Sequence, residues 1–410
     1  MKITDVRLLG FTAPCYIGPD KDGHSHPCKQ RKGAFAVLNI DTDEGVTGEY
    51  TFATTRPAPS ADYNPDVLET CGDSESIGNL AGAIRRLRPV LIGEDPRCRE
   101  RIVTRMTRMQ RLYFDLTDPV LAMVDCALWD LLGKLAGMPV FRLLGGHRTR
   151  VAAYGSIMVG DDIPGGLCVP EDYARYAKQL VARGYTAIKL HTWMDEPWDE
   201  RTYSGKPDPE KDVAACAAVR EAVGPGVPLM LDAFHGYSRQ EALYIGRELE
   251  KLNFCWIEEP MDEYSLSSYR WLCDHLDLPV CGPETMLGKQ ATRAEWIREG
   301  AADIIRAGAR DVGGLTVLQK IVHLCEAYQM PMDLHGPEPA NVSMLTAVTY
   351  PYGYVERGLL HPFLDYDATP PWMHTPYDCM DSRGDVIVSE KPGFGLDLDY
   401  AYIRDHAITE

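Results

Sequence analysis

Two kinds of apolar pattern divide the chain. Residues 2–14 and 33–50 read as antiparallel strands, and Asp43, Glu44 and Gly45 form the expected turn within the second segment. A loop rich in Gly, Pro, His and Lys is expected between the two segments, over residues 15–32. Helices are expected from about residue 76 to residue 135. The first third is therefore predicted to be an α+β domain.

One of the expected helices carries clear end signals. Asp118 is expected as its N-cap, with Pro119 at the first helical position. Apolar residues recur at helical spacing from Val120 to Leu135, and Gly137 and Pro139 follow the last turn. This pattern predicts a helix between Pro119 and Gly137.

From about residue 150, short apolar runs alternate with amphipathic helices. The strand candidates are VAAYGSI, TAIKLHTW, PLMLDAF, FCWIEE, LPVCGPE, ADIIRAG, MPMDLHG and YGYVE. Eight such strands favour a parallel β/α barrel of the TIM type over an open doubly wound sheet. No dinucleotide-binding fingerprint or Walker-type loop follows any of them. The expected division is residues 1–135, residues 150–380, and a tail, residues 385–410, that returns to the first domain.

Three of these strands end in a carboxylate at one fixed interval. Asp232, Glu258 and Glu284 follow each other at 26 residues, roughly the length of one strand, one helix and two short loops. The strand ends of a barrel converge on its C-terminal mouth, where active sites of this architecture lie. Because three convergent carboxylates repel each other unless a cation neutralises them, the spacing predicts a divalent-metal site.

Composition narrows the class of partner. The 410 residues carry a net charge of −18, which argues against nucleic acid or an anionic membrane as partner. No apolar stretch approaches the ~20 residues that a membrane helix needs, and the N-terminus lacks the apolar run of a signal peptide. Twelve scattered cysteines without a CxxC pair indicate reduced thiols. We therefore expect a cytoplasmic protein.

Basic side chains stand near the same strand ends. Lys189 and His191 are alternate residues of one strand and so face the same side, which makes them candidates for carboxylate binding and proton transfer. An ordinary solvent-exposed strand end is the alternative. His335 ends the seventh strand and would face the mouth from across the barrel, so that two proton-transfer groups flank one substrate carbon.

Other residues are candidates for substrate contact. Glu356 ends the eighth strand, where it either supports the site or pairs with Arg357. The first loop could close over an anionic substrate or form a mobile, solvated basic segment; its basic residues are His24, His26, Lys29, Arg31 and Lys32. The insertion after the second strand fits a polyhydroxylated substrate and carries Trp193, Trp198, Arg201 and Lys206.

With these residues in view, the chain resembles the enolase superfamily over essentially its whole length. Within it, the chain is similar to the mandelate racemase / muconate lactonizing enzyme-like group. Besides the three carboxylate strands, the segments that carry the resemblance are Ala127–Lys134 with Leu143–Gly146, Asp311–Thr316 and Lys391–Asp397.

The resemblance implies an α+β capping domain over a modified β/α barrel. It also implies Mg²⁺ held by Asp232, Glu258 and Glu284; an oxygen-only ligand set suits Mg²⁺, with Mn²⁺ as the alternative. The implied chemistry is abstraction of the proton α to a carboxylate. An α-proton is too weakly acidic for a side-chain base unless the developing charge is neutralised.

Two positions depart from the group's pattern. His191 stands where the group's Lys-x-Lys motif has its second lysine as base. Gly308 stands where an aspartate usually pairs with the strand-seven histidine, so His335 is expected to lack this partner and to act as an acid rather than a strong base. Asp333, two residues before His335, could substitute in part, and a structural role for it is the alternative.

The leading hypothesis is an acid-sugar dehydratase that converts an aldonate or aldarate to a 2-keto-3-deoxy acid. A racemase, epimerase or cycloisomerase is the alternative in the same fold, but a racemase needs two matched bases. A non-catalytic barrel protein is disfavoured, because a silent site has no physical reason to keep mutually repelling charges. We expect a small anionic sugar acid as partner and a homo-oligomer.

Overall fold

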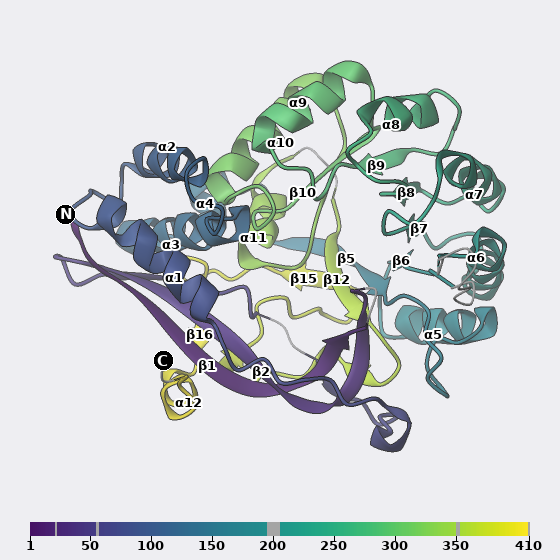
Figure 1. Cartoon of the computed structure of the whole chain (residues 1–410), viewed down its shortest axis with the longest axis horizontal. Coiled ribbons are helices and arrows are strands. Elements are labelled where there is room, and N and C mark those ends of the chain that lie inside the picture. The colour runs from purple at the N-terminus through teal and green to yellow at the C-terminus, as the bar shows by residue number, and fades with distance from the viewer. Residues whose placement is uncertain (21–22, 55–56, 195–205, 350–352, 409–410) are drawn as a thin grey trace.

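The structure, a computed structural model, describes residues 1–20, 23–54, 57–194, 206–349 and 353–408. An N-terminal layer of long strands and helices lies against a ring of alternating strands and helices (Figure 1). This arrangement confirms the expected fold class, a modified TIM-type β/α barrel with an α+β capping domain. Within the described ranges, no helix is both long enough and apolar enough to cross a membrane.

The N-terminal sheet is a three-stranded antiparallel meander, made of β1 (Ile3–Pro19), β2 (Ser25–Thr42) and β3 (Thr47–Tyr50). The prediction of a loop over residues 15–32 is wrong, because most of that segment continues β1 and β2. The two strands pair as far as Pro19 with Ser25. Cys15 and Cys28 are buried while Lys29 and Lys32 are exposed. Lys29 and Lys32 thus lie on the outer face of a strand.

A short strand and several helices complete the N-terminal part; these are β4 (Ala58–Pro59), the 3₁₀ helix η1 (Pro65–Val67), α1 (Gly78–Leu91), α2 (Arg99–Gln110), α3 (Asp118–Ala136) and α4 (Val140–Leu143). The helix expected after Pro119 is α3, and Gly137 ends it with a φ of 63°. The expected N-cap is wrong: Thr117 is the N-cap residue. The Asp118 carboxylate instead accepts hydrogen bonds from Lys289 and Gln110.

All eight expected barrel strands are present. They are β5 (Arg150–Ile157), β6 (Ala187–Leu190), β7 (Leu229–Asp232), β8 (Trp256–Glu258), β9 (Val280–Gly282), β10 (Ile304–Ala307), β11 (Met332–Leu334) and β12 (Val355–Leu360). Neighbours pair in parallel along the path β11-β10-β9-β8-β7-β6-β5-β12. The helices around them are α5 (Pro170–Ala182), α6 (Pro209–Val223), α7 (Arg239–Lys251), α8 (Leu266–Cys273), α9 (Lys289–Glu299), α10 (Leu315–Tyr328) and α11 (Pro339–Ala347).

The C-terminal segments contact both parts. β15 (Asp385–Ile387) pairs antiparallel with β5, while β13 (Leu364–Asp365) pairs with β4 and β14 (Met373–Thr375) with β16 (Asp397–Leu398). The last helix, α12 (Tyr400–Asp405), lies beside β1 (Figure 1), and Thr12 N–H donates to His406 O at 2.9 Å. The division at residues 135, 150, 380 and 385 stays a prediction.

Candidate active site

Two of the three equally spaced carboxylates lie side by side at the ends of neighbouring strands. Asp232 ends β7 and Glu258 ends β8, and the two residues are partners in the parallel register. Both are buried, with 6% of Asp232 and none of Glu258 exposed. Glu284 lies two residues beyond β9, and its N–H donates to Glu259 Oε1 at 3.1 Å. Adjacent strands thus place all three side chains at one end of the barrel.

Lys189, the third residue of β6, bridges this group. Its Nζ lies 3.1 Å from Asp232 Oδ2, 2.9 Å from Glu258 Oε2 and 2.8 Å from Glu356 Oε1. Lys189 is fully buried. Burial is the strongest influence on its pKa and lowers it, yet the carboxylates, Glu258 foremost, leave the pKa well above the ordinary lysine value. Lys189 is therefore a permanent cation in the barrel.

Arg306, the third residue of β10, is a second buried cation that sequence reasoning missed. Its Nε lies 2.6 Å from Glu258 Oε1 and 3.0 Å from Glu284 Oε2. Its Nη2 lies 2.5 Å from Glu356 Oε2, and its Nη1 contacts Asp333. The available signal was an arginine inside an otherwise apolar strand, Ile304-Ile305-Arg306-Ala307, where a buried charge needs partners.

The group fits a divalent cation in charge and donor type. The two buried cations, Lys189 and Arg306, contact five carboxylates. These are the side chains of Asp232, Glu258, Glu284, Asp333 and Glu356. Burial raises the pKa of Glu258 to about 8 despite Arg306 and Lys189. Its Oε1 lies 2.6 Å from Arg306 Nε, but the geometry of this ion pair does not make a hydrogen bond. A further positive charge would therefore stabilise the ionised form of Glu258, and carboxylate oxygens are the donors that Mg²⁺ prefers.

The three equally spaced carboxylates do not yet converge on one point. Among the described residues, Asp232, Glu258 and Glu284 do not bring three oxygens within 4.8 Å of one another. Glu284 instead contacts Arg306, and its Oε1 lies 3.1 Å from His335 Nδ1. Convergence of all three on one ion therefore requires a change in side-chain conformation at the mouth.

His191 follows β6 at the same mouth. Its Nδ1 donates to Ile157 O at 2.8 Å, which directs Nε2 toward Asp232 Oδ2 at 2.9 Å. Burial raises the pKa of Asp232, but His191 and Lys189 outweigh it and hold the pKa below the ordinary range. The alternation of inward Lys189 and His191 with outward Ile188 and Leu190 places this histidine over the carboxylates.

His335 follows β11 and has an anionic partner, contrary to expectation. Its Nδ1 lies 3.0 Å from Asp311 Oδ2. Burial lowers the pKa of His335, but Glu284 and Asp311 together raise it to about 10. The expected substitute, Asp333, accepts from Tyr154 OH at 3.0 Å and contacts Arg306 instead. The partner therefore comes from the turn after β10, three residues beyond Gly308.

Gly308 makes room for this pair. A Cβ at Gly308 would lie 2.4 Å from Asp311 Oδ2 and 3.1 Å from His335 O. The glycine that suggested a missing partner is thus what allows the partner to approach from another position.

The other substrate-contact candidates divide into two groups. Glu356 is buried at the mouth with Lys189 and Arg306, whereas Arg357 pairs with Asp378 and Asp367, so of the two alternatives for Glu356 the pair with Arg357 is not formed. His24 packs against Trp193 with the ring centres 4.7 Å apart, and His24 is buried. His24 and His26 therefore do not form a solvated loop. Trp198 and Arg201 lie outside the described residues.

These groups line one cavity of about 760 Å³ between the barrel mouth and the β1–β2 hairpin. His191, Asp232 and His335 reach it from the barrel, and His24 and Arg31 reach it from the hairpin. Arg310, from the turn after β10, also lines it. His235 lines the same wall and pairs with Glu259, whose Oε2 lies 3.0 Å from His235 Nε2. The cavity thus combines buried carboxylates, two histidines at separate strand ends and the arginines Arg31 and Arg310.

Comparison with known proteins agrees with this architecture. Residues 27–145 match the N-terminal domain of the mandelate racemase / muconate lactonizing enzyme family, and residues 172–402 match the enolase C-terminal domain-like family. A D-glucarate dehydratase from Agrobacterium tumefaciens, crystallised with magnesium, is 45% identical, with a TM-score of 0.89 and complete coverage of both chains.

Two curated relatives from other organisms are dehydratases too. An arabinonate dehydratase from Saccharolobus solfataricus is 31% identical over 81% of this chain and 80% of its own. An L-talarate/galactarate dehydratase from Salmonella typhimurium is 29% identical over 75% of this chain and 71% of its own. The family matches together span most of the chain. The chain therefore belongs to the mandelate racemase / muconate lactonizing enzyme family of the enolase superfamily, in the group that holds the acid-sugar dehydratases.

Proposed function

We propose that this protein is a Mg²⁺-dependent hydro-lyase that converts a sugar acid to a 2-keto-3-deoxy acid. The observation that carries the proposal is the placement of His191 and the His335–Asp311 pair at the ends of β6 and β11, on one cavity with buried carboxylates. These strands are separated by four others along the sheet. Two proton-transfer groups approaching one substrate from separate sides suit an elimination.

Asp232, Glu258 and Glu284 would hold the metal. When bound, Mg²⁺ would supply the positive charge that stabilises the enediolate formed by loss of the α-proton. Lys189 and Arg306 would keep the remaining carboxylates of the mouth paired, since both are permanent cations in contact with them. The magnesium-bound Agrobacterium dehydratase supports this cofactor.

His191 and His335 would share the proton transfers. One imidazole takes the proton from C2, and the other donates a proton to the departing 3-hydroxyl, so that water leaves and the enol tautomerises to the 2-keto acid. His191 Nδ1 is fixed by Ile157 O, and His335 Nδ1 by Asp311, so in each ring Nε2 would be the atom that exchanges a proton with substrate. In His191 this atom faces Asp232 Oδ2, a contact that would give way to the substrate.

Arg310 favours a dicarboxylic sugar acid as substrate. It is exposed on the cavity wall, its guanidinium carbon lies 5.5 Å from the centre of the Phe52 ring, and no described carboxylate lies within 4 Å of it. Such a cation can bind a second carboxylate through a bidentate contact. The name of the 45%-identical D-glucarate dehydratase agrees with a dicarboxylic acid.

Isomerisation is the second candidate, and one observation favours it. The expected absence of an anionic partner for His335 was the reason to disfavour two matched bases, and Asp311 removes that reason. Both reactions begin with removal of the same proton. They differ in whether the 3-hydroxyl leaves, so the product distinguishes them.

The test is a screen of aldonates and aldarates with Mg²⁺, read by 2-keto acid formation and by α-proton exchange in heavy water. We expect a 2-keto-3-deoxy acid from at least one aldarate. Exchange with a change of configuration and no keto acid would establish an isomerase instead. Absence of product, exchange and Mg²⁺ binding would leave only a non-catalytic barrel protein.

A further inference from the structure

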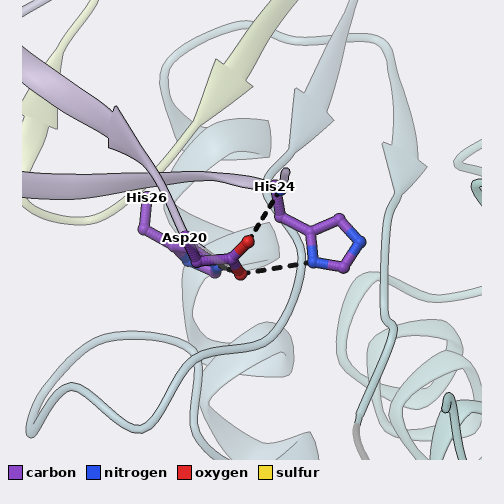
Figure 2. A group of neighbouring side chains, drawn as sticks. All are labelled: Asp20, His24 and His26. Carbon is purple, nitrogen blue, oxygen red and sulfur yellow. Dashed lines mark hydrogen bonds and ion pairs between the residues drawn. The ribbon is translucent and has the colours of Figure 1, made fainter. Parts of the chain in front are cut away.

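A second group of metal-ligating side chains lies at the tip of the β1–β2 hairpin. Asp20, His24 and His26 each offer one ligand atom, and these three atoms lie within 4.8 Å of one another. Asp20 Oδ2 is 3.3 Å from His24 Nδ1 and 2.9 Å from His26 Nε2 (Figure 2). No other group of three such residues is this compact in the described parts of the chain.

The backbone of the tip fixes the carboxylate between the two rings. Asp20 N–H donates to His24 O at 2.9 Å, and His24 N–H donates to Asp20 Oδ1 at 2.9 Å. The second oxygen, Oδ2, is left to face both imidazoles (Figure 2). The three ligand atoms are thus positioned by the hairpin itself, and residues 21–22 between them lie outside the described ranges.

Barrel residues hold the His24 ring in place. His24 is 6% exposed, and its ring lies 4.7 Å from Trp193 and 4.9 Å from Phe234. Trp193 follows β6 and Phe234 follows β7, so the hairpin tip is packed on two barrel loops. A ligand whose ring is already ordered loses little conformational entropy on binding a metal ion.

The spacing agrees with a transition-metal ion. Donors bonded to Zn²⁺ at about 2.0–2.1 Å in a tetrahedron lie about 3.3 Å apart, and the two distances from Asp20 Oδ2 are 3.3 and 2.9 Å. Imidazole nitrogens suit Zn²⁺ and its neighbours, whereas the oxygen-only set at the barrel mouth suits Mg²⁺. The two sites therefore differ in the class of metal that they select.

We infer that Asp20, His24 and His26 bind a Zn²⁺-class ion that ties the end of β1 to the start of β2 above the active-site cavity. Three protein ligands leave further coordination positions for water or for an oxygen of a bound molecule. The site is separate in sequence and in donor type from the barrel carboxylates. It does not depend on the proposed dehydration, so its failure would leave that proposal intact.

The test is titration of the full-length protein with Co²⁺ in the presence of excess Mg²⁺. Imidazole-bound Co²⁺ in a low-coordinate site is followed by its visible absorption, and stoichiometry by equilibrium dialysis. We expect one equivalent of Co²⁺, displaced by Zn²⁺, and a higher melting temperature with Zn²⁺ present. Asp20→Asn and His26→Gln should each weaken binding at least ~100-fold, because loss of an outer partner alone costs 10–100-fold.

Two controls separate this site from others. His323→Gln, an exposed histidine on α10, should leave Co²⁺ binding unchanged. Glu258→Gln removes a barrel carboxylate and should also leave the Co²⁺ spectrum in place. A spectrum that survives His26→Gln but disappears in Glu258→Gln would overturn the inference. So would the absence of any Co²⁺ binding in excess Mg²⁺, which would show that the tip is held by hydrogen bonds alone.

Discussion

Gly308→Ala is expected to impair catalysis without touching the histidine or its aspartate. The new Cβ would meet Asp311 Oδ2 at 2.4 Å, a distance that must relax. The end of a flexible side chain moves more easily than backbone, and the next contacts, His335 O at 3.1 Å and His335 Cβ at 3.3 Å, are tight but tolerable. The Asp311 carboxylate should therefore swing away from His335.

The expected loss follows from the contact that is broken. Asp311 Oδ2 and His335 Nδ1 are 3.0 Å apart, and hydrogen bonds to charged groups contribute about 1.5–3 kcal/mol. The His335 side chain is 37% exposed, so solvent screening favours the lower half of this range. At about 1.4 kcal/mol per factor of ten, kcat should fall roughly 10- to 40-fold. Asp311→Asn should cause a loss of the same order.

The assay is 2-keto acid formation, with α-proton exchange measured in parallel and melting temperature as a check on folding. Glu326→Gln, an exposed carboxylate on α10, is the matched control and should behave as wild type. If Asp311→Asn keeps kcat within twofold of wild type, the pair does not assist His335 and the reasoning fails. If Asp311→Asn is impaired but Gly308→Ala is not, the space argument alone is refuted.

Three further predictions concern the metal, the proton-transfer histidines and the substrate. Chelation should abolish activity, and added Mg²⁺ should restore it; full activity after chelation would contradict the proposed cofactor. Glu258→Gln should lower kcat at least ~100-fold, because the charge stabilisation that a metal ion supplies is worth several kcal/mol. His191→Asn should lower kcat about 10²–10⁴-fold. Measuring α-proton exchange in His191→Asn and in His335→Asn identifies the base as the histidine whose loss abolishes exchange. If His191→Asn retains both exchange and turnover, His191 is not the base. Arg310→Gln should lower kcat/KM roughly 10- to 100-fold for a sugar diacid and less than about threefold for the monoacid, and equal losses on both would show that Arg310 does not bind the second carboxylate.

The barrel could be predicted because its strands are apolar on both faces. Each run of apolar residues from VAAYGSI to YGYVE became a strand, and helices of ordinary length separated them. The hairpin could not be predicted in the same way. Its distal half is rich in Gly, Pro and Lys, which favour loops locally, and only pairing between β1 and β2 and the burial of Cys15 and Cys28 make it a strand pair.

The candidate site was predictable where one residue per strand carried it. The carboxylates and Lys189 follow from strand ends and from the two-residue alternation within a strand. The partner of His335 did not follow, because Asp311 lies in a turn whose path no periodicity reveals. Counting along the sequence placed the usual aspartate at Gly308, and the structure supplies the same contact from three residues further on. His335 thus has an anionic partner, although that partner lies at a different position in the sequence from the expected one.

Arg306 shows why the carboxylates can occupy one mouth. Arginine stays charged at any pH that a protein experiences, and this one contacts Glu258, Glu284, Asp333 and Glu356 from inside the barrel. A charge fixed in the strand does not depend on metal concentration, so part of the repulsion is balanced by the fold itself. Burial nevertheless raises the pKa of Glu258 to about 8, so the two cations stabilise its ionised form only in part. The two cations thus offset enough of the negative charge at the mouth for the chain to fold. The charge that they leave uncompensated favours binding of a divalent cation, as a metal-dependent enzyme requires.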